Sequence, residues 1–147
     1  MEIAILGLGC FWGPEIKFNK LDGVIKTEVG YCGGNSSETT YKEVCTGTTN
    51  HAEVVKLDFD PKIISYKKIL KFFFEIHDPT TLNSQGPDFG TQYRSEIFYF
   101  NDQQKEISEK IIKEENIKFS GKVVTKNSLV KNYCPAEEYH QKYLEKR

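Results

Sequence analysis

Apolar and polar positions along the first thirty residues follow two different periods, and together they predict a compact βαβ unit. Residues 3–8 form a continuous apolar run, which is typical of a strand buried on both faces. An amphipathic segment from Pro14 to about residue 21 predicts a helix, with Pro in an early turn where a missing N–H is tolerated. After the Asp22-Gly23 turn, residues 24–29 predict a second strand.

Residues 52–59 alternate cleanly between apolar and polar side chains, which predicts a strand with one buried face. Val55, Leu57 and Phe59 share that face, and Glu53 lies in register with them. A carboxyl on a buried face should be partly desolvated and should hold its proton more readily. The alternative is that Glu53 sits at the wet end of the strand.

The remaining elements complete a second βαβ unit and add a short C-terminal part. We expect a helix over 61–76 that ends at His77-Asp78-Pro79, and then a strand over 95–100. A second helix should run from Asp102 to about 116, with Asn101-Asp102 as its start signal. A short strand beginning at 123–124 and a last helix over 135–144 should follow. This order predicts an α+β fold, a two-layer sandwich with a ferredoxin-like βαββαβ core. Residues 30–50 and 80–94 are expected to be long loops, which in compact domains usually carry function.

Composition narrows the class of protein. The 147 residues predict a single catalytic domain spanning 1–147, and 20 basic against 21 acidic residues give a net charge of −1 with no basic stripe for nucleic acid or membrane. The apolar runs are too short to span a bilayer. The four cysteines form no C-x-x-C pair, so we expect reduced thiols and a cytoplasmic protein. Cysteines and histidines show no spacing of a zinc site, and we expect no metal and no cofactor.

The run Gly7-Leu8-Gly9-Cys10-Phe11-Trp12-Gly13 places a cysteine at the predicted strand-to-helix turn. Backbone N–H groups and the positive helix end should favour the thiolate of Cys10 there. Phe11 and Trp12 add an apolar wall that suits a small, partly apolar substrate. The alternative is that Cys10 is a small buried residue of the core with no role in chemistry. The glycines also loosely match a dinucleotide-binding fingerprint, but two bulky aromatics stand where a pyrophosphate needs bare backbone.

Several separated motifs occur in an order that resembles the methionine sulfoxide reductase A family. They are Gly9-Cys10-Phe11-Trp12-Gly13, Gly30-Tyr31-Cys32-Gly33-Gly34, Tyr41-Lys42-Glu43-Val44-Cys45, His51-Ala52-Glu53, His77-Asp78-Pro79 and Gly90-Thr91-Gln92-Tyr93-Arg94. The resemblance covers residues 9–144. It implies an enzyme that reduces the S-epimer of methionine sulfoxide, free or in proteins.

The resemblance also implies a role for each matching residue. Cys10 matches the nucleophile that attacks the sulfoxide sulfur, and Glu53 matches the acid that protonates the oxygen. Tyr41 and Tyr93 match hydroxyls that hydrogen-bond the developing oxygen charge. Phe11 and Trp12 match the pocket for the methyl group. Asp88 matches the residue that orients the polar end of the substrate. After methionine leaves, Cys10 is a sulfenic acid that a second thiol must reduce.

The sequence departs from the family in its recycling cysteines. Many members carry them in a Gly-rich tail beyond the last helix, and we expect no such tail here. Cys134, Cys32 and Cys45 are the possible resolving residues, with Cys134 expected at a helix N-cap before Pro135. An external thiol acting directly is equally open, as is inert packing of all three. Thioredoxin or another thiol reductant is the implied partner, and we expect a monomer.

Two other classes of function share some of these residues. One is a nucleotide-binding module on the glycine turn, although the chain lacks the second half that such folds use. The other is a Cys-His hydrolase that pairs Cys10 with His51. Histidines in folded proteins are more often structural, so we expect His51, His77 and His140 to lie outside the catalytic set.

Overall fold

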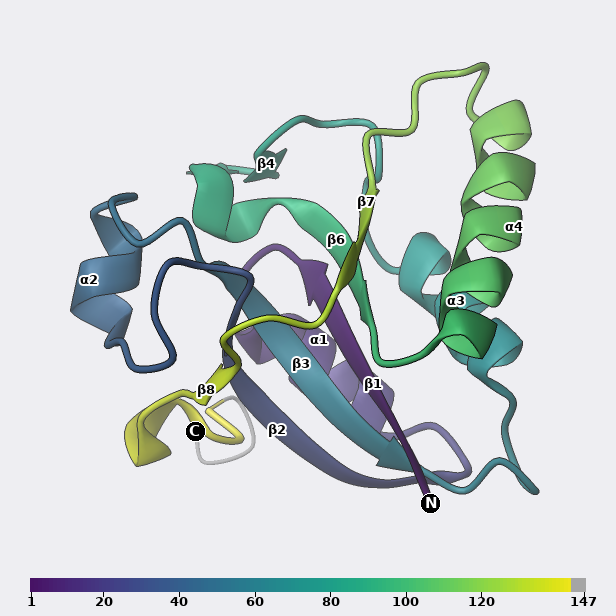
Figure 1. Ribbon diagram of the computed structural model, residues 1–147, viewed down its shortest axis with the longest axis horizontal. Coiled ribbons are helices and arrows are strands. Elements are labelled where there is room, and N and C mark those ends of the chain that lie inside the picture. Colours follow the sequence, from purple (N-terminus) through teal and green to yellow (C-terminus); the bar gives the residue numbers. More distant parts are fainter. Residues whose placement is uncertain (144–147) are drawn as a thin grey trace.

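A computed structural model describes residues 1–143, a mixed α/β fold built on one six-stranded sheet (Figure 1). The strands run in the order β7-β6-β1-β3-β2-β8, and the β6–β7 pair is parallel while the other pairs are antiparallel. Their bounds are Glu2–Leu8 for β1, Val24–Cys32 for β2, Ala52–Phe59 for β3, Ser95–Tyr99 for β6, Lys126–Leu129 for β7 and Cys134–Pro135 for β8. A separate hairpin pairs β4 (Ser84–Gln85) with β5 (Asp88–Phe89).

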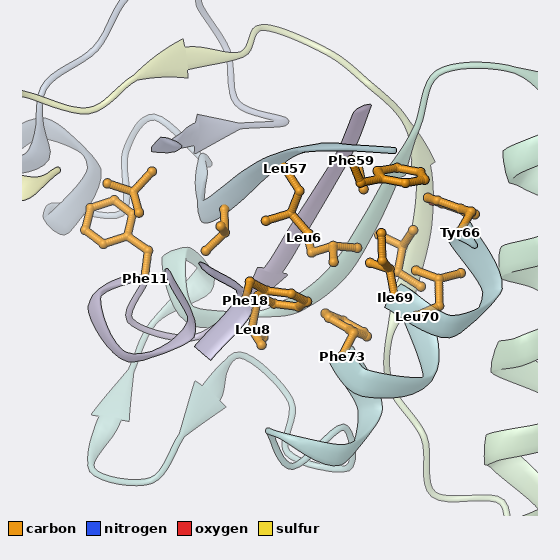
Figure 2. Packing of buried hydrophobic residues seen from close by; sticks show 14 of the residues in the cluster. Leu6, Leu8, Phe11, Phe18, Leu57, Phe59, Tyr66, Ile69, Leu70 and Phe73 are labelled. Atoms are coloured by element: carbon orange, nitrogen blue, oxygen red, sulfur yellow. The ribbon is translucent and has the colours of Figure 1, made fainter. Parts of the chain in front are cut away.

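Helices α1 (Trp12–Asn19), α3 (Tyr66–Glu75) and α4 (Asp102–Lys118) contribute buried residues to the main core on one face of the sheet. The short helix α2 (Tyr41–Cys45) adds Val44 to the same core. Figure 2 shows Phe18 of α1 and Phe73 of α3 packed beside Leu6 and Leu57, with Phe11 at the far end of the cluster from Phe59. All six side chains are no more than 1% exposed, so this face is dry from end to end.

The opposite face of the sheet holds a smaller apolar cluster. Ile5, Cys32, Val54 and Phe98 are buried there, and the chain around Tyr133 packs over them. Successive side chains of a strand point to opposite faces. Cys32 therefore lies on one side of β2 and its neighbour Tyr31, a member of the main core, on the other.

Local chemistry explains where the helices begin. The side chains of Ser65 and Asn101 accept hydrogen bonds from the backbone N–H groups of Lys68 and Gln104, which caps α3 and α4. The helix expected from residue 61 thus starts at Tyr66, because residues 61–64 form a turn held by Asp60. No helix of residues 1–143 is long and apolar enough to cross a membrane.

The expected C-terminal helix over 135–144 is wrong for the residues that the structure describes. Cys134–Pro135 forms β8 against β2, and only a single 3₁₀ turn follows, Glu138–His140. The segment satisfies its polar groups on the edge of β2: the Gln141 side chain bonds both the N–H and the C=O of Val29. Lys142 has φ +51°, which a continuing helix would not allow. Position 144 lies outside the described residues.

Both expected loops contain short regular elements. Residues 30–50 include the end of β2 and the helix α2 (Tyr41–Cys45), which Thr40 caps through the N–H of Glu43. Residues 80–94 contain the β4–β5 hairpin and a 3₁₀ turn, Thr91–Tyr93. The strand expected from 123–124 forms slightly later, as β7 beside β6. These elements are too short for periodicity to reveal.

Candidate active site

Cys10 lies in the turn between β1 and α1, and glycine makes that turn possible. Gly9 has φ +99°, a conformation that side chains rarely adopt, and a Cβ there would lie 2.8 Å from the Cβ of Gln85. The β4–β5 hairpin can therefore approach the cysteine closely. Cys10 itself is half-buried, and all four cysteines of the chain are free thiols.

The pKa of Cys10 is opposite to the sequence-based expectation. Burial of the thiol raises its pKa to about 11, and the nearby Glu53 and Asp88 add to that, although the backbone of Trp12 lowers it. Desolvation by burial raises the pKa of the thiol more than the N-terminus of α1 lowers it. The helix α1 is only 8 residues long, and the β4–β5 hairpin packs against the turn at Gly9. In the resting site Cys10 is a neutral thiol.

Glu53 occupies the buried face that its alternation predicts. It pairs with Tyr31 in the β2–β3 register and is 1% exposed. Its Oε1 accepts a 3.4 Å hydrogen bond from the backbone N–H of Phe11, the residue after the cysteine. Its Oε2 has no hydrogen-bond partner among the described residues. Burial raises the pKa of Glu53 to about 8, so the carboxyl holds its proton at neutral pH.

Asp88 reaches the same place from the hairpin. In the β4–β5 register Asp88 stands opposite Gln85, the residue that packs against Gly9, so both point toward the Cys10 turn. Gln85 is held in place by hydrogen bonds with the N–H of Asp78 and the hydroxyl of Thr81. The charge of Asp88 contributes to the raised pKa of both Cys10 and Glu53.

Two tyrosines complete the group from the two loop regions. Tyr41 begins α2, and its ring centroid lies 6.5 Å from that of Phe11. Tyr93 ends the 3₁₀ turn before β6, and its side chain interacts with that of Tyr41. Burial raises the pKa of Tyr41 and raises that of Tyr93 to about 12, and Glu53 contributes to both shifts. Both hydroxyls keep their protons and can donate hydrogen bonds.

An aromatic cluster forms one wall of the site, and it includes residues that the sequence reasoning left out. Trp12 stacks on Tyr143 with ring centroids 3.9 Å apart, and its Nε1–H donates to Nδ1 of His140 at 3.2 Å. His140 is 3% exposed and also packs against Phe11 and Tyr41. Residues His140 and Tyr143 were hidden because a helix was expected there. No local signal in the sequence pairs them with Trp12, because the contact joins residues more than 120 positions apart.

The other two histidines have partners elsewhere. His51 is 1% exposed, and its Nε2 is 2.8 Å from the carbonyl of Ser36. His77 bridges the carbonyl of Phe73 and the hydroxyl of Ser95. Burial lowers the pKa of each ring. Both histidines are packing residues, and this arrangement gives no support to a hydrolase that pairs Cys10 with His51.

The structure separates the three further cysteines from one another. Cys32 is fully buried on the sheet face opposite Glu53. Cys134 is half-buried in β8, so its expected position at a helix N-cap is wrong. Cys45 is exposed at the end of α2, next to Tyr41.

Comparison with known proteins identifies the family. The family model described as peptide methionine sulfoxide reductase matches residues 2–147. The chain belongs to this family. A peptide methionine sulfoxide reductase MsrA from Pelagibacter ubique (strain HTCC1062) is 83% identical over 147 residues, which cover all of both chains.

Solved structures of the family resemble this one closely. Mxr1 from Saccharomyces cerevisiae in reduced form matches with a TM-score of 0.95 and 43% identity, over 99% of this chain and 85% of that one. Mxr1 in complex with Trx2 matches with a TM-score of 0.70 and 28% identity, over 97% of this chain and 84% of that one. The methionine sulfoxide reductase assignment therefore rests on sequence and on fold together.

Proposed function

We propose that this methionine sulfoxide reductase converts the S-epimer of methionine sulfoxide, free or within proteins, to methionine, with Cys10 as nucleophile and Glu53 as general acid. The observation that carries the proposal is the carboxyl of Glu53. It is buried and protonated at neutral pH, it is tied to the backbone beside Cys10, and its Oε2 has no partner among the described residues. A buried, protonated carboxyl without a hydrogen-bond partner can donate its proton to a substrate oxygen that enters the site.

The sulfoxide oxygen is the acceptor that this acid fits. Oxygen is a poor leaving group from sulfur until it is protonated, so the reaction needs an acid at the oxygen. Glu53, with a pKa of about 8, is largely in its acid form at pH 7. An ordinary glutamate, with a pKa near 4.5, would have lost that proton.

The Cys10 thiol supplies the two electrons. Its sulfur attacks the sulfoxide sulfur as the oxygen takes a proton from Glu53, and the thiol proton returns Glu53 to its acid form. The S–O bond of the substrate breaks, the oxygen is transferred to the sulfur of Cys10, and the products are methionine and a sulfenic acid. A neutral thiol and a neutral acid are the forms that the raised pKa values favour, so the proton count balances without any outside base.

The two tyrosines and the aromatic wall serve the same reaction. The hydroxyls of Tyr41 and Tyr93 donate hydrogen bonds to the oxygen as its negative charge develops. The half-buried ring of Trp12, stacked on Tyr143, receives the methyl group, and buried Phe11 supports the base of that pocket. Asp88 orients the polar end of the substrate from the hairpin.

We further propose the surroundings in which the enzyme works. Thioredoxin or another thiol reductant regenerates Cys10, and the complex of the yeast relative with Trx2 supports such a partner. A reduced cytoplasm, a monomer and a single catalytic domain over 1–147 complete the proposal. The strand order β6-β1-β3-β2, with α1 and α3 as its crossovers, supports a ferredoxin-like βαββαβ core.

An assay with separated S and R epimers of a methyl sulfoxide tests this function, with dithiothreitol as reductant. The wild-type protein should reduce the S-epimer alone to the sulfide, and Cys10→Ser should abolish the reaction. Cys134→Ser is the matched control, because it removes a half-buried thiol outside the site. Turnover of the R-epimer, or turnover that survives Cys10→Ser, would overturn the proposal.

A further inference from the structure

The sulfenic acid of Cys10 has to be removed before a second turnover, and three other thiols are present. This question rests on the proposed function, because only that reaction generates the sulfenic acid. A resolving thiol must reach Cys10, and an external reductant must then reach the resulting disulfide. The structure distinguishes the three thiols on both requirements.

Cys32 fails the first requirement. Its side chain is 0% exposed in the small cluster on the far face of the sheet, beside Ile5 and Phe98. Its Sγ donates to the carbonyl of Lys131 at 3.3 Å. Because β2 itself separates Cys32 from the face that carries Glu53, contact with Cys10 would require the sheet to open.

Cys134 lies on the correct face but behind another residue. It pairs with Tyr31 across β2–β8, and Tyr31 in turn pairs with Glu53 across β2–β3. Two strand spacings put Cys134 about 10 Å from Glu53. The buried Tyr31 ring stands between them and packs against Phe11 at 5.8 Å. The Cys134 thiol faces the carbonyl of Thr39 at 3.7 Å.

Cys45 lies beside the reacting groups. It follows Tyr41 by four residues in α2, and side chains four apart share one face of a helix. Tyr41 is directed toward the site, with its ring 6.5 Å from Phe11 and 4.4 Å from His140. Cys45 is also the one further cysteine whose charge contributes to the raised pKa of Cys10. Burial raises the pKa of the Cys45 thiol, and a hydrogen bond with the side chain of Tyr41 partly offsets that rise.

The attachment of α2 allows the necessary approach. Glu137 accepts a 3.0 Å hydrogen bond from the N–H of Tyr41 and anchors the first turn. The other end, with Cys45 and residues 46–48, is exposed and continues into irregular chain. A disulfide needs Cα atoms about 4.4–6.8 Å apart. Val44 anchors α2 in the main core, so the adjustment falls to the exposed residues from Cys45 onward and not to a strand.

We propose that Cys45 resolves the sulfenic acid of Cys10 in an intramolecular disulfide, and that its exposed sulfur is where the external reductant attacks. The Cys45 thiol displaces the hydroxyl from Cys10–SOH, so that an S–S bond forms and one water leaves. A dithiol reductant then attacks the Cys45 sulfur, releases the Cys10 thiol, and is itself oxidised to a disulfide as Cys45 regains its proton.

A single-turnover experiment tests this route. Reduced protein is mixed with one equivalent of methionine S-sulfoxide and dimedone, without reductant, and remaining thiols are then alkylated. In the wild-type protein we expect one methionine per chain, a Cys10–Cys45 disulfide peptide, and alkylation of the other two cysteines. In Cys45→Ser and Cys45→Ala we still expect methionine, but with dimedone attached to Cys10.

Cys134→Ser is the control variant and should give the wild-type disulfide. Dimedone on Cys10 of the wild-type protein with Cys45 alkylated, or a disulfide from Cys10 to Cys134 or Cys32, would overturn the inference while leaving the proposed function intact. Failure of the wild-type protein to release methionine would instead overturn the function. With thioredoxin as reductant, steady turnover of Cys45→Ser should fall by about tenfold or more, since the exposed sulfur is lost.

Discussion

The two faces of the sheet each bury a glutamate, and the two glutamates have opposite surroundings. Glu53 of β3 is 1% exposed on the face covered by helices, and Glu96 of β6 is 4% exposed on the other face. Glu96 is paired with Arg94 at 2.6 Å and accepts a 2.6 Å hydrogen bond from Ser128. Glu53 has a single 3.4 Å hydrogen bond and an oxygen without a partner among the described residues.

The difference teaches that burial alone does not mark a functional carboxylate. Glu96 is ion-paired and hydrogen-bonded, and removing it would leave the Arg94 guanidinium uncompensated in a dry place. Glu53 avoids the cost of a lone buried charge by keeping its proton. The proton that makes burial of Glu53 tolerable is the same proton that the proposed reaction uses.

Glu53→Gln should have the largest effect on activity. The amide keeps the shape but cannot give up a proton, so kcat/KM should fall by roughly 10²–10⁴-fold. The free energy of unfolding should not fall, because no charge pair is lost. Activity with the S-epimer and urea denaturation measure the two quantities. Near-normal activity of this variant would remove the acid from the mechanism.

Glu96→Ala should have the converse effect. We expect the free energy of unfolding to fall by about 3–5 kcal/mol, because breaking a buried pair strands the opposite charge. Molecules that remain folded should keep most of their activity. Denaturation curves check the first statement and assays below the melting temperature check the second. A stable variant without activity would show that Glu96 takes part in the reaction, and the difference in role between Glu96 and Glu53 would no longer hold.

Tyr41→Phe should have a smaller effect. The loss of one of two hydroxyl donors should lower kcat by up to about 10²-fold, with less change in KM, because the bond strengthens only as charge develops. Tyr93→Phe should behave similarly and the double variant worse. A rise in KM with kcat unchanged would instead indicate that the hydroxyl binds the substrate in the ground state. Steady-state kinetics, which give kcat and KM separately, distinguish these outcomes.

The pH profile should show the mildest change, about tenfold per pH unit at most. The proposed reaction requires the acid form of Glu53, so kcat/KM should decline as pH rises through about 8. Glu53→Gln should lack that limb. A wild-type decline centred near 4.5, the ordinary value for glutamate, would mean that the carboxyl is not shielded.

The same shift predicts the pH dependence of stability. Folded Glu53 keeps a proton that the unfolded chain loses above about 4.5, so its contribution is complete below that pH and is lost as pH rises through about 8. The free energy of unfolding, measured by denaturation at several pH values between these limits, should fall with pH more steeply for wild type than for Glu53→Gln. An equal pH dependence in the two proteins would contradict the raised pKa.

Much of the fold was predictable from local pattern because long elements carry many repeats of one signal. The strand over 52–59 matches Ala52–Phe59, and its alternation correctly put Glu53 on the core face. The helix after Asn101 also begins as its cap predicts. Short elements gave no such signal. The five residues of α2 and the two-residue strands of the hairpin appeared only as loops.

The sequence by itself determined the strands, the glycine turn that holds Cys10 and the face on which Glu53 lies, since each follows from neighbours a few residues away. Tertiary structure alone decided the protonation of the site and the fate of the C-terminal segment. Desolvation depends on everything packed around a group, which is why Cys10 is a neutral thiol despite the adjacent helix end. The segment after Pro135 does not form the expected helix because β2 binds its Ala136 N–H and its Gln141 side chain.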